Sequence, residues 1–361
     1  MPREVDSMTV QGIVLLVLFA AVLAAFGVIL RMLVRLLKRG GPEQRFDRWG
    51  ERVKSVLVYV GAQARVLSRP AGLGHFIIFW GFIFITLGTA EHMLGMMIPG
   101  FGYEVVIGTT LDGVLSFMLE VFGLLVIGAI VVSLVRRLFF KPLRLRIDDP
   151  KAKMEAVFIL GLIFVLILLM YGIRGTEILM DGPPESVAYA PVSYFAAGWM
   201  GGWGMNLPVA NGVFAWAHHL IIFFFLVYIP FSKHIHILGA VPNVFFRNLG
   251  PAGTLSRMDF EDETVEKYGI SEIQEFTWKQ LLDLYACTEC GRCQAVCPAF
   301  LTDKPLSPYR VVHRLRGHLM RERGALLGGG YGESGAPQIV PDTVTEDEIW
   351  SCTTCGACMQ E

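Results

Sequence analysis

The stretch MEAVFILGLIFVLILLMYGIRGTEIL at residues 154–179 decides the fold class of this chain. From Val157 to Tyr171 it holds no charged residue. A helix rises about 1.5 Å per residue, so about 20 apolar residues cross a hydrocarbon core of roughly 30 Å. The stretch is therefore predicted to form a transmembrane helix.

Four further apolar stretches have the same character, at roughly 10–30, 75–98, 112–135 and 213–233. The whole chain of 361 residues is 53% hydrophobic and 17% charged, too apolar for an ordinary soluble protein and too charged to lie wholly in lipid. We predict a mainly α protein, with a five-helix transmembrane bundle in residues 1–240 and a soluble domain in residues 241–361. The net charge of -1 gives no basic field, so no nucleic-acid partner is expected.

The basic residues of the connections are distributed unevenly. The connection from Arg31 to Arg69 holds ten Lys or Arg and the one from Arg136 to Lys153 holds seven, while 99–111 and 181–212 hold none. Basic loops stay on the cytoplasmic side of a membrane. The sequence therefore predicts a multi-pass protein of the cytoplasmic (inner) membrane, with its N-terminus outside and its C-terminal domain in the cytoplasm.

All cysteines of the chain lie in the predicted soluble domain, in two motifs. The first motif, CTECGRCQAVCP, supplies Cys287, Cys290, Cys293 and Cys297, and the second, CTTCGAC, supplies Cys352, Cys355 and Cys358. Reduced, metal-binding thiols in a cytoplasmic domain are the natural interpretation. A structural zinc site usually pairs one CxxC with another or with histidines, and that pattern fits these motifs poorly.

The spacing of the two motifs favours two [4Fe-4S] clusters in an α-helical, ferredoxin-like domain. In two-cluster ferredoxins, three cysteines spaced by two residues hold one cluster, and the fourth, before a proline, ligates the other. Cys297 is therefore predicted to complete the cluster of the second motif. The cluster of the first motif needs a further cysteine just beyond Glu361, so we expect that the sequence is truncated within this domain.

Histidines gather at the ends of the second and fifth predicted spans: His75, His92, His218, His219, His234 and His236. Because these spans run antiparallel, His75 is level with His234 or His236, and His92 with His218 or His219. Two bis-histidine haem b sites, one near each membrane face, would use these levels. Residues eighteen apart share a helix face, which favours His218 and His236 and leaves His219 and His234 as alternates. A hydrogen-bonded or snorkelling side chain is the alternative interpretation of each histidine.

A few charged residues lie within or near the outer halves of the spans. Glu120, Arg174 and Glu177 are candidates for a quinone or proton path, because ionisable groups in spans are costly and usually functional. An ion pair of Arg174 with one of these acids is the simpler alternative. The outer loop from Asp181 to Asn211 is rich in Tyr and Trp, which indicates an interfacial aromatic belt or one wall of a quinone pocket.

Three stretches of the C-terminal domain resemble the ferredoxin module of heterodisulfide-reductase-like iron-sulfur proteins: ACTECGRCQAVCPA, KPLSPYRVVHRLR and IWSCTTCGACM. The five-helix part resembles the dihaem cytochrome b subunit of respiratory nitrate reductase. Their fusion is similar to the electron-transfer-flavoprotein:menaquinone oxidoreductases. The resemblance implies that all seven cysteines bind clusters and that His75, His92, His218 and His236 bind haem.

The same resemblance implies a quinone-linked oxidoreductase. Its electrons would pass from reduced electron-transfer flavoprotein through the clusters and two b haems to menaquinone or another quinone. The expected partners are electron-transfer flavoprotein, the membrane quinone pool and the lipid bilayer. Two alternatives are the quinol-driven reduction of a cytoplasmic disulfide or sulfur-carrier protein, and a non-catalytic membrane anchor that only conducts electrons.

Overall fold

The structure is a computed structural model that describes residues 10–140, 150–183, 187–251, 260–261, 263–264, 267–331 and 335–361. Its regular elements are helices, and no strand occurs within these ranges. The chain divides into two compact units. The membrane unit comprises Met1–Phe26, Gln63–Lys141 and Ile147–Tyr228, and the cysteine unit comprises Gly27–Ala62, Pro142–Arg146 and Ile229–Glu361.

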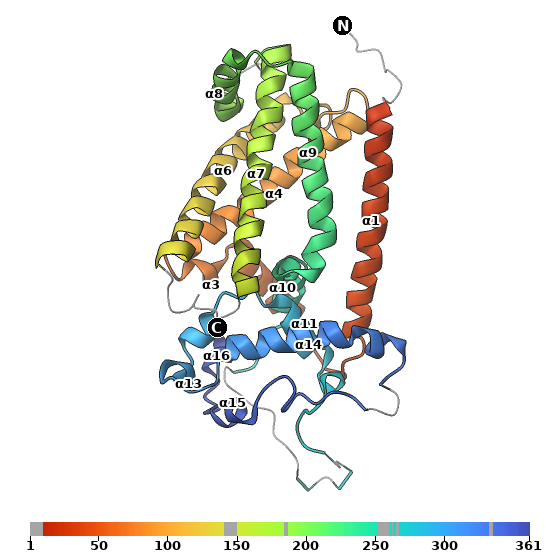
Figure 1. Ribbon diagram of the computed structural model, residues 1–361, viewed down its shortest axis with the longest axis vertical. Coiled ribbons are helices and arrows are strands. Elements are labelled where there is room, and N and C mark those ends of the chain that lie inside the picture. Colours follow the sequence, from red (N-terminus) through yellow and green to blue (C-terminus); the bar gives the residue numbers. More distant parts are fainter. Residues whose placement is uncertain are drawn as a thin grey trace. The chain divides into compact units, whose positions relative to one another are not determined.

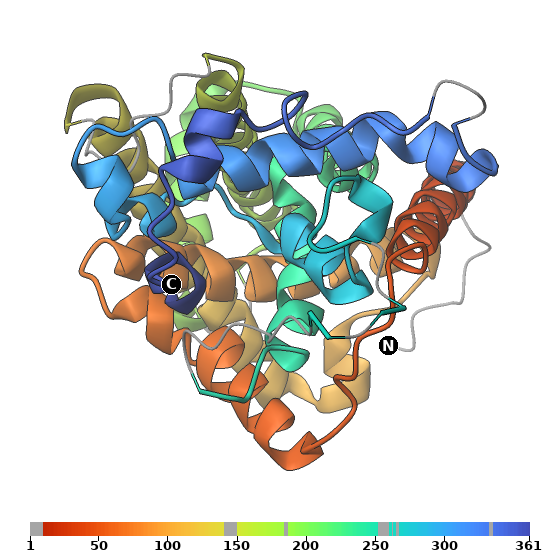
Figure 2. The same cartoon turned by 90° about the horizontal axis from the view of Figure 1, so that it is seen from below.

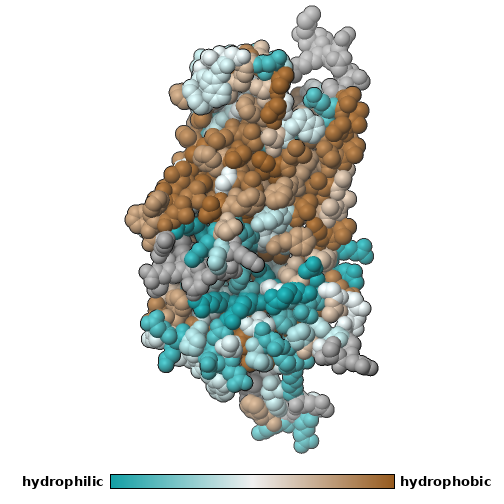
Figure 3. Space-filling view, in the orientation of Figure 1, coloured by the Kyte–Doolittle hydropathy of each residue, from teal (hydrophilic) through white to brown (hydrophobic). Residues whose placement is uncertain are grey.

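Among the described residues, five helices are long and apolar enough to cross a membrane, which confirms the predicted number. They are α1 Val10–Leu37, α4 Gly72–Met97, α6 Thr109–Val135, α7 Pro150–Asp181 and α9 Leu207–Tyr228. A π-helical turn, η2 Arg136–Phe140, continues α6. In the membrane unit α4 packs on α6, α6 on α7 and α7 on α9 (Figure 1). Their outward faces carry the apolar residues that appear brown in Figure 3.

Glycines allow α4 and α6 to approach each other closely. A Cβ atom at Gly81 would lie 2.3 Å from Val126 Cγ2, and one at Gly88 would lie 2.0 Å from Leu119 Cδ1. Small residues at such contacts let membrane helices pack backbone to side chain. Leu119 and Val126 are accordingly buried, within the apolar core that α6 shares with α7.

The connections of the membrane unit are short helices: α3 Ala64–Leu67, α5 Tyr103–Ile107, η4 Val187–Tyr189, α8 Pro191–Met200 and η5 Gly201–Trp203. The helix α8 packs on α6 and α7. It buries Ser193 and Ala197 and leaves the rings of Phe195 and Trp199 exposed. This distribution is that of an interfacial aromatic segment, one of the two interpretations of the outer loop.

The cysteine unit is built from short helices around one longer helix, α14. Its elements are α2 Trp49–Val56, η1 Leu57–Gly61, η6 Ile229–Phe231, η7 Lys233–Ile235, α10 His236–Phe245, η8 Ile273–Glu275, α11 Trp278–Ala286, α12 Arg292–Ala295, α13 Pro298–Leu301, α14 Pro308–Gly328, α15 Glu346–Trp350 and α16 Ala357–Gln360. Figure 2 shows α14 crossing this unit, with α11 packed against it.

The core of the cysteine unit joins segments that are distant in the sequence. Leu281 and Leu319 are almost fully buried and form a cluster with Val344. Leu33 and Leu36, from the last turns of α1, belong to the same cluster. The unit therefore includes the segment 27–62 in addition to 229–361. The domain boundary placed at residue 240 from the sequence stays a prediction.

Candidate functional site

The two cysteine motifs have the same backbone conformation. The third residue of each CxxC, Glu289 or Thr354, is left-handed, with φ of 55° and 52°. The glycine after each CxxC, Gly291 or Gly356, is also left-handed, with φ of 69° and 71°. Glycine adopts this region without steric cost. Each loop then leads into a short helix, α12 or α16, and these two helices pack together.

The thiols fall into two neighbouring sets. Burial, followed by the nearby Cys287 and Cys290, raises the pKa of Cys293 to about 12. Burial, followed by Cys297 and Cys352, raises the pKa of Cys358. Cys297, which belongs to the first motif in the sequence, thus lies beside the second motif in space, as crossed ligation requires.

Backbone amides favour the thiolate form of the middle cysteine in each motif. Burial alone would raise the pKa of Cys290, but the Arg292 amide and guanidinium lower it. The Ala357 amide, with smaller contributions from Thr353, lowers the pKa of Cys355. Because the thiolate is the metal ligand, both loops are suited to bind iron.

Among the residues that the structure describes, no three His, Cys, Asp or Glu side chains converge on a position for a single metal ion. A four-iron cube binds each thiolate through a different iron, so its ligands stand farther apart than those of one ion. The all-cysteine donor set is the one that [4Fe-4S] clusters use. The seven cysteines therefore fit iron-sulfur clusters better than a mononuclear site.

The membrane unit brings two of the candidate haem histidines together. The rings of His92, on α4, and His219, on α9, are 5.2 Å apart between centroids and nearly parallel, at 17°. His219 Nδ1 contacts the Ala215 carbonyl at 2.7 Å. Within the described part of the chain, His219 Nε2 and His92 Nδ1 are buried without a hydrogen-bond partner. Two such nitrogens among apolar helices are the donors that a haem iron takes.

His218 faces a different environment from its neighbour. Its Nδ1 lies 3.1 Å from the Leu166 carbonyl on α7. Its Nε2 lies 3.0 Å from Thr89 Oγ1 on α4. Both ring nitrogens are thus engaged in hydrogen bonds that tie α9 to α7 and α4. Helical phase favoured His218 as a ligand, whereas these contacts favour His219.

The histidines near the inner ends lie in both units. His75, in the membrane unit, has its Nδ1 3.1 Å from Gln63 Oε1. In the cysteine unit the rings of His234 and His236 are 5.5 Å apart, and His236 Nδ1 lies 2.9 Å from the Lys233 carbonyl. Burial lowers the pKa of His236, which favours the neutral imidazole that binds metals. The pairing of His75 with His234 or His236 stays a prediction.

Glu120 is fully buried at the contact of α6, α7 and α8. Its Oε1 accepts hydrogen bonds from Arg174 Nε at 2.9 Å and from Ser193 Oγ at 2.5 Å, and its Oε2 accepts one from the Ser193 amide at 2.7 Å. Tyr171 donates to the Glu120 carbonyl at 2.6 Å. A buried charge satisfied in this way fastens α8 to the bundle. The ion pair weighed in the sequence analysis is therefore present.

Glu177 is more open than Glu120. Its side chain is 41% exposed, and its Oε1 lies 3.6 Å from His92 Nε2. Of the three charged candidates for a quinone or proton path, Glu177 alone contacts a candidate haem ligand. A carboxylate that reaches both solvent and such a histidine can exchange protons there.

A buried ion cluster that no local sequence pattern indicates lies beside the first cysteine motif. Glu289, whose side chain is 2% exposed, lies 2.6 Å from Arg316 Nη2 and 3.4 Å from Lys233 Nζ. The charge of Glu289 within CTEC was visible in the sequence. Its burial was not, because the residues that cover it lie 27 and 56 positions away.

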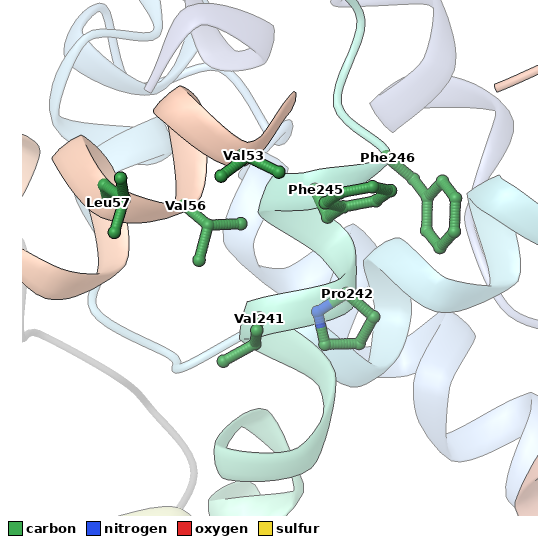
Figure 4. A pocket seen from close by; sticks show the side chains of 7 residues that line it. All are labelled: Val53, Val56, Leu57, Val241, Pro242, Phe245 and Phe246. Carbon is green, nitrogen blue, oxygen red and sulfur yellow. The ribbon is translucent and has the colours of Figure 1, made fainter. Parts of the chain in front are cut away.

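An apolar groove of 360 Å³ lies between α2 and α10 in the cysteine unit (Figure 4). It is lined by Val53, Val56, Leu57, Val241, Pro242, Phe245 and Phe246. None of these side chains can titrate or bind a metal. The groove therefore contributes no group to the cysteine or histidine sites.

Comparison with known proteins supports the iron-sulfur character of the C-terminal domain. Residues 283–361 match the model of the 4Fe-4S dicluster domain. The chain is 32% identical over 96% of its length to the probable iron-sulfur-binding oxidoreductase FadF of Bacillus subtilis, covering 52% of that protein. It is also 32% identical over 93% of its length to the EtfAB:quinone oxidoreductase of Syntrophomonas wolfei, covering 49% of it.

The name of a third relative combines a membrane anchor with a ferredoxin. The chain is 33% identical over 45% of its length to a probable membrane-anchored ferredoxin of Chromohalobacter salexigens, covering 27% of that protein. The chain spans about half the length of the first two relatives. No solved structure matches it. These findings define a helical protein with a 4Fe-4S dicluster domain and, in the part of the chain that the structure describes, five helices long and apolar enough to cross a membrane.

Proposed function

We propose that this protein is a membrane oxidoreductase that passes electrons from reduced electron-transfer flavoprotein to menaquinone. The proposal rests mainly on one observation: a single chain combines two cysteine loops suited to iron-sulfur clusters with a buried histidine pair among apolar helices. The similarity to a protein named EtfAB:quinone oxidoreductase, over 93% of the chain, supports electron-transfer flavoprotein as the donor and a quinone as the acceptor.

The cysteine loops would hold two [4Fe-4S] clusters in the cytoplasm. Cys352, Cys355 and Cys358 with Cys297 supply four ligands for one cluster. Cys287, Cys290 and Cys293 supply three for the other. The amides that lower the pKa of Cys290 and Cys355 hold these thiols ready as ligands.

The bundle would hold two b haems, which with the clusters supply one-electron carriers between the cytoplasm and the quinone. We assign His92 and His219 to the outer haem, because their orphaned nitrogens are buried in the bundle. His75 with His236 or His234 remains the candidate set for the inner one. Glu177 would exchange protons beside His92, while Glu120 and Arg174 hold α8 in place.

Electrons that move from the cytoplasmic side to the outer side run down the membrane potential. Each elementary charge that crosses gains about 2.3 kcal/mol per 100 mV. This gain would assist an otherwise unfavourable reduction of the quinone. Electrons that pass in the opposite direction, from a quinol on the outer side to an acceptor in the cytoplasm, would lose the same free energy.

The assignment of the outer haem is tested by His219→Leu and His218→Leu in the full-length protein. We expect His219→Leu to lose about half of the b haem, because a bis-histidine site needs both ligands. His218→Leu should keep its haem and lose only the hydrogen bonds to Thr89 and Leu166. Haem is measured by pyridine haemochrome per protein. Loss of haem in His218→Leu with retention in His219→Leu would reverse the assignment.

A further inference from the structure

The first cysteine loop contains a carboxylate in an unusual position. Glu289 lies between Cys287 and Cys290, is left-handed at φ 55° and turns its side chain inward. Left-handed backbone is uncommon for residues other than glycine and calls for an explanation. At the equivalent position of the second loop, Thr354 has the same backbone and an exposed side chain.

Three cationic or basic side chains surround the Glu289 carboxylate. Its Oε1 lies 2.6 Å from Arg316 Nη2 and 3.5 Å from His313 Nε2, and its Oε2 lies 3.4 Å from Lys233 Nζ. The side chains of Arg316 and Lys233 are 13% and 8% exposed. Buried charges interact with much less screening than charges in water.

The same groups reach the cluster loop and the segment that follows the fifth span. Arg316 Nη1 donates to the Cys287 carbonyl at 3.3 Å. Lys233 begins the turn η7, and its carbonyl lies 2.9 Å from His236 Nδ1. Lys233 and Glu289 therefore connect a candidate haem-ligand segment directly to the loop of Cys287 and Cys290.

We propose that the buried Lys233–Glu289–Arg316 network sets the reduction potential of the cluster held by the first cysteine loop. The proposal rests on the proposed function, in that the loop must hold a cluster. A cluster gains one negative charge when it takes up an electron. A nearby buried cation favours that step and a nearby buried carboxylate opposes it, so a change in the balance of Lys233, Arg316 and Glu289 shifts the potential.

The second loop has no counterpart to this network among the described residues. Among the described residues, Thr354 donates hydrogen bonds to the Thr353 carbonyl and to Cys352 Sγ, within the same loop. The network therefore acts on one of two otherwise similar loops, and Lys233, Glu289 and Arg316 are positioning residues.

The test is a pair of substitutions that change the charge in opposite directions, in the full-length protein. Glu289→Gln keeps the shape and removes a negative charge, so the first cluster should become easier to reduce. Lys233→Met removes a positive charge, so that cluster should become harder to reduce. We expect each shift to change the reduction equilibrium about tenfold, which is 59 mV for one electron. The readout is a redox titration followed by electron paramagnetic resonance.

Three controls separate an electrostatic effect from damage to the fold. Glu51→Gln removes the same charge from an exposed pair with Arg48 and should leave both potentials unchanged. Glu289→Asp keeps the charge and should stay near the wild type. The double variant Glu289→Gln/Lys233→Met restores the charge balance. Its first cluster should have a reduction potential close to that of the wild type.

The outcomes distinguish this proposal from the proposed function. Iron assays that find no cluster in the wild type would refute the function itself. Clusters that are present, with shifts of the same sign in Glu289→Gln and Lys233→Met or with no shift in either, would refute the network alone. Opposite shifts confined to the first cluster, with the second cluster unchanged, would support it. If Glu289→Gln does not fold, Lys233→Met still decides the sign, with Glu289→Asp as the charge-retaining control.

Discussion

The two cysteine loops share one design and differ in their surroundings. Each follows a helix with a capping box, which is Thr277 with Gln280 on α11 and Thr345 with Glu348 on α15. Each then repeats the same left-handed positions. The first loop, however, lies beside buried charges and half-buried cysteines, while Cys352, Cys355 and Cys358 of the second are exposed. The backbone is thus set by local sequence, and the environment by distant residues.

This difference implies different roles for the two clusters. A cluster in the first loop would be tuned by fixed charges and lie near His236. A cluster in the second loop would have no comparable network of buried charges among the described residues. Substitutions of residues that only one loop should need test this difference.

The largest effect is expected from Cys297→Ser. Because Cys297 lies beside Cys358 in space, this change should remove the cluster of the second loop and about half of the non-haem iron of the two clusters. Cys293→Ser should instead affect the first loop. Iron content and the resonance spectrum of the remaining cluster are the measurements. Survival of the second cluster in Cys297→Ser would refute crossed ligation.

A smaller effect is expected from Glu348→Gln, which changes the helix before the second loop. Glu348 Oε2 accepts the Thr345 amide at 3.0 Å and its Oε1 pairs with Arg314. Weakening both contacts should destabilise α15 by about 1 kcal/mol. Hydrogen exchange of residues 345–358 should quicken, whereas that of residues 277–293 should not change.

The same glutamate should make the second loop sensitive to acid. Partial burial alone would raise the pKa of Glu348. The Thr345 amide and Arg314 outweigh burial and lower this pKa below its ordinary value of 4.5. The ionised Glu348 carboxylate therefore stabilises α15 fully when the pH is above the ordinary pKa. This stabilisation is lost as the pH falls from the ordinary pKa toward the lowered pKa. Gln280, at the same position of α11, does not titrate. Exchange that accelerates equally in both loops on acidification would contradict this difference.

The smallest difference between the two loops is expected from their left-handed glycines. Gly291→Ala and Gly356→Ala each place a Cβ atom on a left-handed residue, at φ of 69° and 71°. Each should cost about 1 kcal/mol. Thermal unfolding of the two single variants is the comparison. A cost at only one glycine would show that the shared backbone is not equally required.

Much of the fold could be predicted because the thickness of the bilayer sets the length of an apolar helix that crosses it. An apolar run such as 154–179 must be a helix that satisfies its own backbone. Cysteine spacing likewise predicted iron-sulfur clusters, because the ligands of a cluster follow a short local pattern.

The remaining features depend on contacts that no local pattern contains. The choice between His218 and His219 depends on which of them meets Leu166 and Thr89, and therefore on the rotation of α9 in the bundle. The membership of Leu33 in the core of the cysteine unit depends on packing against α11 and α14. The burial of Glu289 depends on Lys233 and Arg316 in the same way.

The most direct test of the account is the anaerobic addition of reduced electron-transfer flavoprotein to the purified full-length protein, followed by its absorption difference spectrum. The account predicts that cluster bleaching is accompanied by the bands of reduced haem b, and that a menaquinone analogue then reverses both. Cluster reduction without any haem b signal, or no reduction by the flavoprotein, would contradict it.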